Sequence, residues 1–243
     1  MSCNNTSPII RSSIGSKSLH HRTGFDSCGF GTHGGTHNEE FNSTFHSSCT
    51  SWINYFSGLA GWPVDWVGDV GVLSCRPPSL HAQARALDLT RIQNPNGAFI
   101  DMNTHWNPSN SCINGNLGFV RHYIAVAASL RRYVGTVLTA WYNSDHHNHI
   151  HFDNGTSVGP IRTTARTDAT LIQAVCRYMN NESIVIDGDW GPATEGAYGR
   201  LLTKVRMQCR NPKGNTSDAL LLLDRIVQSA IRGQTVGGFV GPC

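Results

Sequence analysis

Two short motifs, far apart in the chain, constrain the fold more than any other feature. The first runs from Ser79 to Asp88 and the second from His147 to Asp153. Residues 85–90 alternate between polar and apolar types, and histidine and aspartate alternate with apolar residues in the second motif. Such alternation predicts two strands with one apolar and one polar face. Because buried polar groups must be paired or ligated, the polar faces need a partner.

A metal ion would be a suitable partner for these side chains. His81 precedes Asp88 by seven positions, and His149 shares a strand face with His151. Two imidazoles and one carboxylate suit a catalytic zinc with an open fourth position, which leaves one histidine to handle protons. The chain has 12 histidines, and a single one is more commonly a surface or loop residue. The paired motifs favour zinc over a purely structural role.

The pattern S-x-H-x6-D followed by H-x-H resembles the zinc peptidoglycan peptidases. That group includes D-Ala-D-Ala carboxypeptidases, lysostaphin-type endopeptidases and phage endolysin peptidases. The best match is to its bacterial branch, the extensin-like C-terminal domain. Three segments carry the resemblance: 74–76, 79–89 and 135–153.

The resemblance implies one Zn²⁺ with three protein ligands: His81, Asp88 and His151. It implies that His149 is the catalytic base or transition-state stabiliser. It also suggests that Arg76 binds a substrate carboxylate and that Ser79 supports the site.

Two positions depart from this pattern. Relatives usually have glycine where this chain has Ala84, and often an aspartate near the position of Asn148. Neither residue is a metal ligand, so the departures bear on the substrate more than on the metal.

The sequence predicts an α+β protein with a small antiparallel sheet, flanking helices and a zinc site, followed by a C-terminal three-helix module. Residues 1–48 are rich in Ser, Thr, Gly, His and Asn and are expected to form a loop-rich arm. Residues 49–157 form the expected catalytic domain, 158–167 a linker, and 168–243 the helical module. Within the arm, His33 and His37 have a metal-like spacing, but the glycine pair between them argues against a helix and favours a loop.

The spacing of apolar residues and the positions of turn-forming Gly, Pro and Asn predict the elements of the central part. We expect a helix capped by Thr50 or Ser51, a strand over 70–73, a long loop over 101–117, a helix over 119–134 and a strand over 136–141.

The helical part contains a second motif. Residues 184–194 form a turn that enters a helix at Pro192. The turn resembles the D-G-x-x-G-P-x-T signature of a peptidoglycan-binding three-helix module. Its candidate wall-binding residues are Asp187, Gly188, Trp190 and Gly191. The alternative is a helical cap without a ligand.

Composition limits the location and partners. The net charge of +3 is too small to argue for nucleic acid binding, and no apolar run is long enough to span a membrane. Eight widely spaced cysteines without a C-x-x-C pair favour disulfides over a cysteine zinc cluster, with one local bridge expected among Cys176, Cys209 and Cys243. The N-terminus lacks the pattern of a signal peptide. We therefore expect an extracytoplasmic protein. Either its signal was removed from this numbering, or it leaves its maker by another route, such as a phage lysis or injection machine.

Two functions remain open at this stage. The first is a zinc peptidase that hydrolyses peptidoglycan stem peptides or cross-links, as a carboxypeptidase or an endopeptidase. The second is a non-catalytic, zinc-containing wall-binding module, since the hedgehog signalling domain also resembles this group. The complete ligand set with His149 favours the enzyme.

Overall fold

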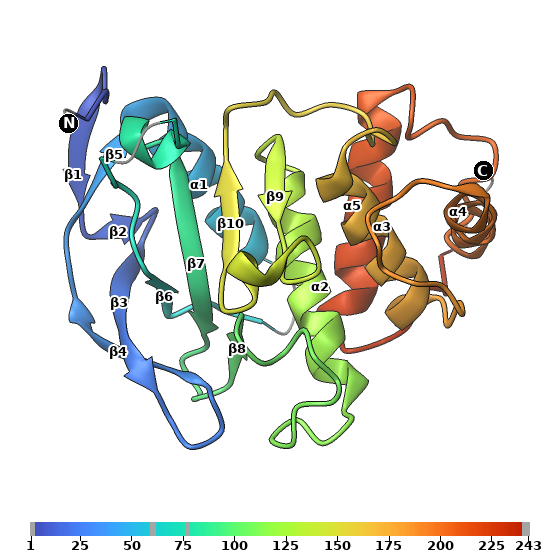
Figure 1. Cartoon of the computed structure of the whole chain (residues 1–243), viewed down its shortest axis with the longest axis horizontal. Helices are drawn as coiled ribbons and strands as arrows, with labels where there is room; N and C mark the ends of the chain where they lie inside the picture. The colour runs from blue at the N-terminus through green and yellow to red at the C-terminus, as the bar shows by residue number, and fades with distance from the viewer. Residues whose placement is uncertain (1–2, 59–61, 76–77, 240–243) are drawn as a thin grey trace.

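The computed structural model describes residues 3–58, 62–75 and 78–239, and it has the expected α+β architecture (Figure 1). The strands are β1 (Pro8–Arg11), β2 (Ser13–Ile14), β3 (Lys17–Phe25), β4 (Gly31–Thr36), β5 (Glu39–Asn42), β6 (Trp66–Asp69), β7 (Ala86–Gln93), β8 (Phe99–Asp101), β9 (Thr136–Leu138) and β10 (Ile150–Asp153). The helices are α1 (Ser43–Ser57), α2 (Leu117–Arg131), α3 (Arg166–Met179), α4 (Pro192–Lys204) and α5 (Thr216–Ala230), with short 3₁₀ turns η1 (Leu80–Gln83) and η2 (Ser144–His146).

The main sheet is larger than the small sheet expected from the sequence. It has eight strands, of which six follow the order β2-β3-β6-β7-β10-β9, while β4 pairs with β3 and β8 with β7. The β3–β6 pair is parallel, and the other pairs are antiparallel. Strands β1 and β5 form a separate two-stranded ribbon.

The expectation of a loop-rich arm over residues 1–48 is wrong, because residues 8–42 contain β1 to β5 and α1 begins at Ser43. Strand β3 has one fully buried apolar residue, Leu19, and its other positions are intermediate or exposed. Its hydrogen bonds to β4 and β6 therefore hold it in place more than burial does. A strand of this kind leaves almost no apolar alternation in the sequence.

The two faces of the sheet differ. Phe152 on β10 lies opposite Leu87 on β7, and both are buried. The rings of Phe45 and Trp52 on α1 lie 5.7 and 5.6 Å from the Phe152 ring, and Figure 1 shows α1 behind β7 and β10. Because side chains alternate along a strand, the residues between these apolar positions face away from α1.

Helix α1 begins earlier than the sequence predicts. Its cap is Asn42, whose Oδ1 accepts hydrogen bonds from the backbone N–H groups of Thr44 and Phe45 at 3.1 and 3.3 Å. Buried Phe45 and Cys49 extend the apolar stripe toward the N-terminus. The expected strand over 70–73 is also displaced, since β6 ends at Asp69. The helix expected over 119–134 is present as α2, which begins two residues earlier, at Leu117, and ends at Arg131.

Three helices, α3, α4 and α5, make up the C-terminal part and lie beyond β9 in Figure 1. Helix α2 contacts both α3 and α5, and the buried apolar residues of both parts form one continuous core. Between the two parts, Arg162 donates hydrogen bonds to Asp168 and to the Gly135 carbonyl, so residues 158–167 are held against their neighbours. Separate folding of residues 168–243 stays a prediction.

Two disulfides tie distant segments together, Cys3–Cys75 and Cys28–Cys112. Bridges that close long loops typically contribute about 2–4 kcal/mol to stability. Cys209 is also disulfide-bonded, whereas the buried Cys49 and Cys176 are free thiols. Of the three late cysteines among which one local bridge was expected, Cys209 is bonded and Cys176 takes no part in a bridge within the described residues.

Disulfides are compatible with an extracytoplasmic protein. No helix within the described ranges has the length and apolar content that a membrane crossing requires.

Candidate metal centre

Three side chains from the two sequence motifs meet on the face of the sheet opposite α1. His81 Nε2 lies 3.2 Å from Asp88 Oδ1 and 3.2 Å from His151 Nδ1, and His151 Nδ1 lies 2.9 Å from Asp88 Oδ1. A tetrahedral ion with bonds of about 2.0–2.1 Å holds its ligand atoms roughly 3.3 Å apart. The three atoms therefore have the spacing of one face of a metal coordination tetrahedron, and this group could hold a metal ion.

Asp88 and His151 meet because they are register partners on the adjacent strands β7 and β10. His81 approaches from η1, a short turn capped by Ser79, whose Oγ accepts from the His81 backbone N–H at 3.2 Å. The N-terminal segment holds this turn, since the N–H groups of Asn4 and Asn42 donate to the carbonyls of Ala82 and Ala84. Ser79 thus positions His81 through the backbone.

Ala84 ends the η1 turn in the left-handed region, with φ of 51°. Glycine adopts this conformation without steric cost, whereas a Cβ atom is disfavoured there. The turn geometry therefore favours glycine at this position, where the chain has Ala84. The departure concerns backbone strain in the turn, and Ala84 offers no side-chain donor to a ligand.

Outer hydrogen bonds fix both imidazoles. His81 Nδ1–H donates to the Val72 carbonyl at 2.7 Å, which leaves the Nε2 lone pair facing the other two ligand atoms. His151 Nε2–H donates to Asp153 Oδ2 at 3.2 Å, which leaves Nδ1 for a metal. Metal-binding histidines almost always have such a carbonyl or carboxylate partner. Sequence reasoning placed Asp153 in the motif but assigned it no role, and it missed the Val72 carbonyl.

The pKa values of Asp88 and His151 are shifted in opposite directions, and both shifts favour the charged form. Burial raises the pKa of the Asp88 carboxyl, but hydrogen bonds from His151 and His81 outweigh burial and hold the pKa well below its ordinary value. Burial lowers the pKa of His151, but hydrogen bonds to Asp153 and Asp88 outweigh it and raise the pKa to about 9. A positive charge is therefore favoured between these carboxylates.

His149 lies beside the three ligands and is separate from them. It precedes β10 by one residue, and its Nε2 is 3.5 Å from Asp88 Oδ1. Its Nδ1–H donates to Asn148 Oδ1 at 2.7 Å, which turns the Nε2 lone pair toward the cluster. Burial lowers the pKa of His149. Asn148 therefore orients the His149 ring.

A cavity of about 330 Å³ opens beside the cluster. Ser79, His81 and Asp88 line it together with residues of the segment 70–74. Arg76, the expected carboxylate binder, lies outside the described residues. Arg22 on β3 brings a positive charge near Asp88 and donates to the Asn148 carbonyl at 2.9 Å, a contribution that the sequence did not reveal.

The loop before β10 brings two further histidines close. His146 has its ring 5.1 Å from that of His149, and burial lowers its pKa to about 4. His147 packs against Trp106 at 4.9 Å, and the Trp106 indole N–H donates to the His147 carbonyl. The long loop that carries Trp106 therefore buttresses the loop that carries His149.

Comparison with known families covers this part of the chain. Residues 63–164 match the family described as extensin-like protein C-terminus. The extensin-like segment contains the three candidate ligands and His149. It leaves out β1 to β5, α1 and the three C-terminal helices. Neither the search of curated proteins nor that of solved structures gave a match.

The candidate wall-binding residues of the helical part hold their own loop together. Asp187 Oδ1 accepts from Gln173 Nε2 at 2.7 Å and from the Asp189 N–H at 2.9 Å. The Gly188 N–H donates to Gln173 Oε1 at 2.8 Å, and Gly188 has a φ of 81°. Trp190 donates to Glu195 at 2.6 Å. Asp187 and Gly188 thus shape the turn into α4, and the half-buried Trp190 packs its ring 5.2 Å from that of Tyr198.

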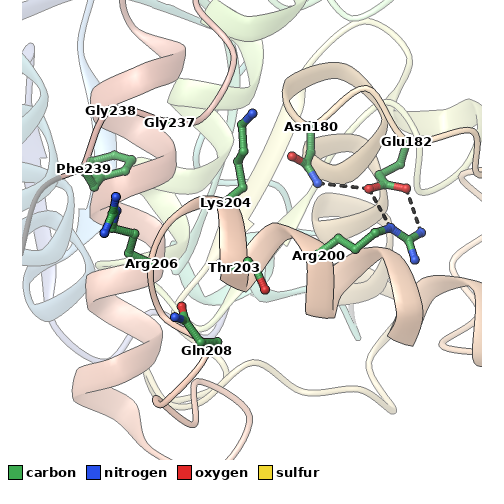
Figure 2. A pocket seen from close by; sticks show the side chains of 10 residues that line it. All are labelled: Asn180, Glu182, Arg200, Thr203, Lys204, Arg206, Gln208, Gly237, Gly238 and Phe239. Carbon is green, nitrogen blue, oxygen red and sulfur yellow. Dashed lines mark hydrogen bonds and ion pairs between the residues drawn. The ribbon is translucent and has the colours of Figure 1, made fainter. Parts of the chain in front are cut away.

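A larger pocket of about 770 Å³ lies elsewhere on the helical part (Figure 2). Arg200 and Lys204 of α4 line it, and the Arg200 guanidinium pairs with Glu182 at 2.7 and 2.9 Å. Its wall also includes Gly237, Gly238 and Phe239, next to the end of the described chain. This pocket is separate from both the metal group and the Asp187–Gly191 loop.

Proposed function

We propose that the chain is a zinc-dependent peptidase that hydrolyses peptide bonds in bacterial peptidoglycan. The observation that carries the proposal is the convergence of His81 Nε2, Asp88 Oδ1 and His151 Nδ1 within 3.2 Å of one another, beside an open cavity. Three protein ligands leave one position of a tetrahedral zinc free, which distinguishes a catalytic site from a structural one. The match of residues 63–164 to the extensin-like family supports the assignment.

The residues around the ligands have roles that suit amide hydrolysis. Bound zinc would supply a water of lowered pKa and would polarise the scissile carbonyl. His149 Nε2 lies 3.5 Å from Asp88 Oδ1, and burial lowers the pKa of the imidazole, which favours its neutral, proton-accepting form. Asn148 holds His149 in this orientation, and Asp153 and the Val72 carbonyl hold the ligands.

Positive charge near the site suits the proposed substrate class. Stem peptides carry carboxylates, and the proposal retains Arg76 as a binder of one of them by paired hydrogen bonds. Arg22 adds positive charge on the β3 side of the site. We propose in addition that the helical part contacts the wall, through Trp190 and the neighbouring loop, which would hold the enzyme at its polymeric substrate. The protein would act outside the cytoplasm, where its disulfides persist.

Zinc content tests the ligand set. Purified wild type and His81→Ala are compared by elemental analysis, with His46→Ala as the matched control, since His46 lies on α1 and bonds to the Ser13 carbonyl. We expect His81→Ala to carry one zinc fewer per chain than wild type, because two ligands hold zinc far more weakly than three. His46→Ala should retain the wild-type content. Equal zinc in all three proteins would exclude this site.

A further inference from the structure

A second cluster of potential ligands lies on β3, on β6 and on the segment that leads from the end of β4 into β5. All but one of its residues lie outside the extensin-like segment. His21 lies on β3, Asp69 on β6, Glu39 at the start of β5, and His37 directly after β4. One nitrogen or oxygen atom from each of the four lies within 4.8 Å of the others. His37 Nε2 is 2.9 Å from Asp69 Oδ2, and His21 Nδ1 is 3.5 Å from Asp69 Oδ1.

One carboxylate oxygen of Asp69 is buried without a hydrogen bond from the described part of the chain. Its side chain is 0% exposed, and its Oδ1 has no hydrogen-bond partner among the residues described. A buried, ionised carboxylate with an unsatisfied oxygen costs several kcal/mol unless a cation or donor compensates it. The neighbouring His21 and His37 rings present nitrogen atoms to the same place, and Glu39 closes it with a second carboxylate.

Fold topology explains why these residues meet. His21 and Asp69 are register partners in the parallel β3–β6 pair. The His37 N–H donates to the Leu19 carbonyl at 3.1 Å, which brings the chain after β4 back to β3. Glu39 then follows two residues later. Four ligands from three adjoining segments are thus fixed by backbone pairing, before any ion binds.

We propose that His21, His37, Glu39 and Asp69 form a second metal site for a divalent transition ion such as zinc. Four protein ligands close a tetrahedral shell, so this ion is structural and has no open position for water. The mixed imidazole and carboxylate set suits zinc rather than calcium or magnesium, which take oxygen ligands. The proposal does not depend on activity at the His81 group.

Two hydrogen bonds through Val72 connect this cluster to the His81 group. Glu39 Oε2 accepts from the Val72 N–H at 3.2 Å, and the Val72 carbonyl accepts from His81 Nδ1 at 2.7 Å. Val72 is buried and therefore has little freedom between these two bonds. An ion that fixes Glu39 would in turn fix the backbone that orients His81.

Metal stoichiometry and anomalous diffraction test the proposal on the full chain. We expect two zinc ions per wild-type chain and one in Asp69→Asn, which keeps the shape of Asp69 but removes its charge. His21→Ala/His37→Ala should also bind one, since both imidazole ligands are lost. His81→Ala should retain the second ion, with its anomalous peak between His21 and Asp69. His20→Ala is the matched control, because His20 neighbours His21 but stacks on Trp66.

Three results would overturn the second site. One is a wild-type chain that binds a single ion which His81→Ala abolishes. Another is an Asp69→Asn protein, folded by circular dichroism, that still binds two ions. The third is an anomalous map without a peak between His21 and Asp69 in crystals soaked with zinc. The first of these would leave the peptidase proposal intact, so the two proposals fail separately.

Discussion

Replacing His149 by alanine should lower hydrolysis of peptidoglycan peptides by on the order of a hundredfold or more, with zinc content unchanged. The three ligands His81, Asp88 and His151 are complete without His149, whose Nε2 lies 3.5 Å from Asp88 Oδ1 and is held by Asn148. A positioned base or oxyanion donor is therefore removed while the metal remains. Turnover of a defined stem peptide and elemental analysis of the same preparation measure both quantities.

Companion variants sharpen this result. His151→Ala should lose activity and the one zinc ion of this site, and His46→Ala should lose neither. If His149→Ala loses zinc as readily as His151→Ala, His149 is a fourth ligand, and the site is a closed structural one. If zinc and hydrolysis both survive, the base is another residue, and His146, whose ring lies 5.1 Å from that of His149, is the next to replace.

Replacing Asp168 by asparagine should lower the free energy of unfolding by about 3–5 kcal/mol, the cost of leaving one buried charge unpaired. Asp168 and Arg131 are each 1% exposed, and the guanidinium donates to the carboxylate at 2.9 and 3.0 Å. The pair joins α3 to α2, so the loss falls on the contact between the helical part and the sheet part. Urea denaturation monitored by circular dichroism gives the change.

The matched control is the exposed pair between Arg200 and Glu182 on the helical part. Arg200→Ala should leave the unfolding curve unchanged, because solvent screens exposed pairs. A loss for Asp168→Asn no larger than that for Arg200→Ala would contradict the account of the α2–α3 contact.

Strong acid should lower the free energy of unfolding of the wild type in the same way as Asp168→Asn does, because it protonates Asp168. Burial raises the pKa of Asp168, but hydrogen bonds from Arg131 and Arg162 outweigh burial and lower it. A carboxyl with a lowered folded-state pKa contributes its full stability above its unfolded pKa and loses it as the pH falls through the folded pKa. The stability gap between wild type and Asp168→Asn should therefore be full at neutral pH and narrow in strong acid.

The first ligand group could be predicted because its residues lie in two short motifs with alternating polar and apolar residues. Asp88 and His151 alternate with apolar residues on strands that pair, so one strand period places both on the open face. His81 lies on a short turn capped by Ser79, which was not predicted from the sequence, although Ser79 was assigned a supporting role. Three-helix packing after residue 166 follows equally from apolar periodicity.

The remainder depends on tertiary contacts that a sequence does not display. The outer hydrogen bond of His81 goes to a backbone carbonyl, at Val72, and no side-chain pattern marks a carbonyl. The second cluster joins His21, His37 and Asp69 through the parallel β3–β6 pair, and β3 has little apolar alternation. The spacing of His33 and His37 was visible, but His33 bonds to Thr90 on one face of the sheet while His37 bonds to Asp69.

The most direct test of the central proposal is digestion of purified peptidoglycan by the zinc-loaded protein, with mass analysis of the soluble products. The account predicts soluble peptides or amino acids from wild type and from His46→Ala, with one water added per bond cut and divided between the two new ends, and none from His151→Ala. The masses also show whether a terminal residue or a cross-link was cut. A zinc-loaded wild type that sediments with the wall and releases no fragment would contradict the peptidase and favour the non-catalytic wall-binding module.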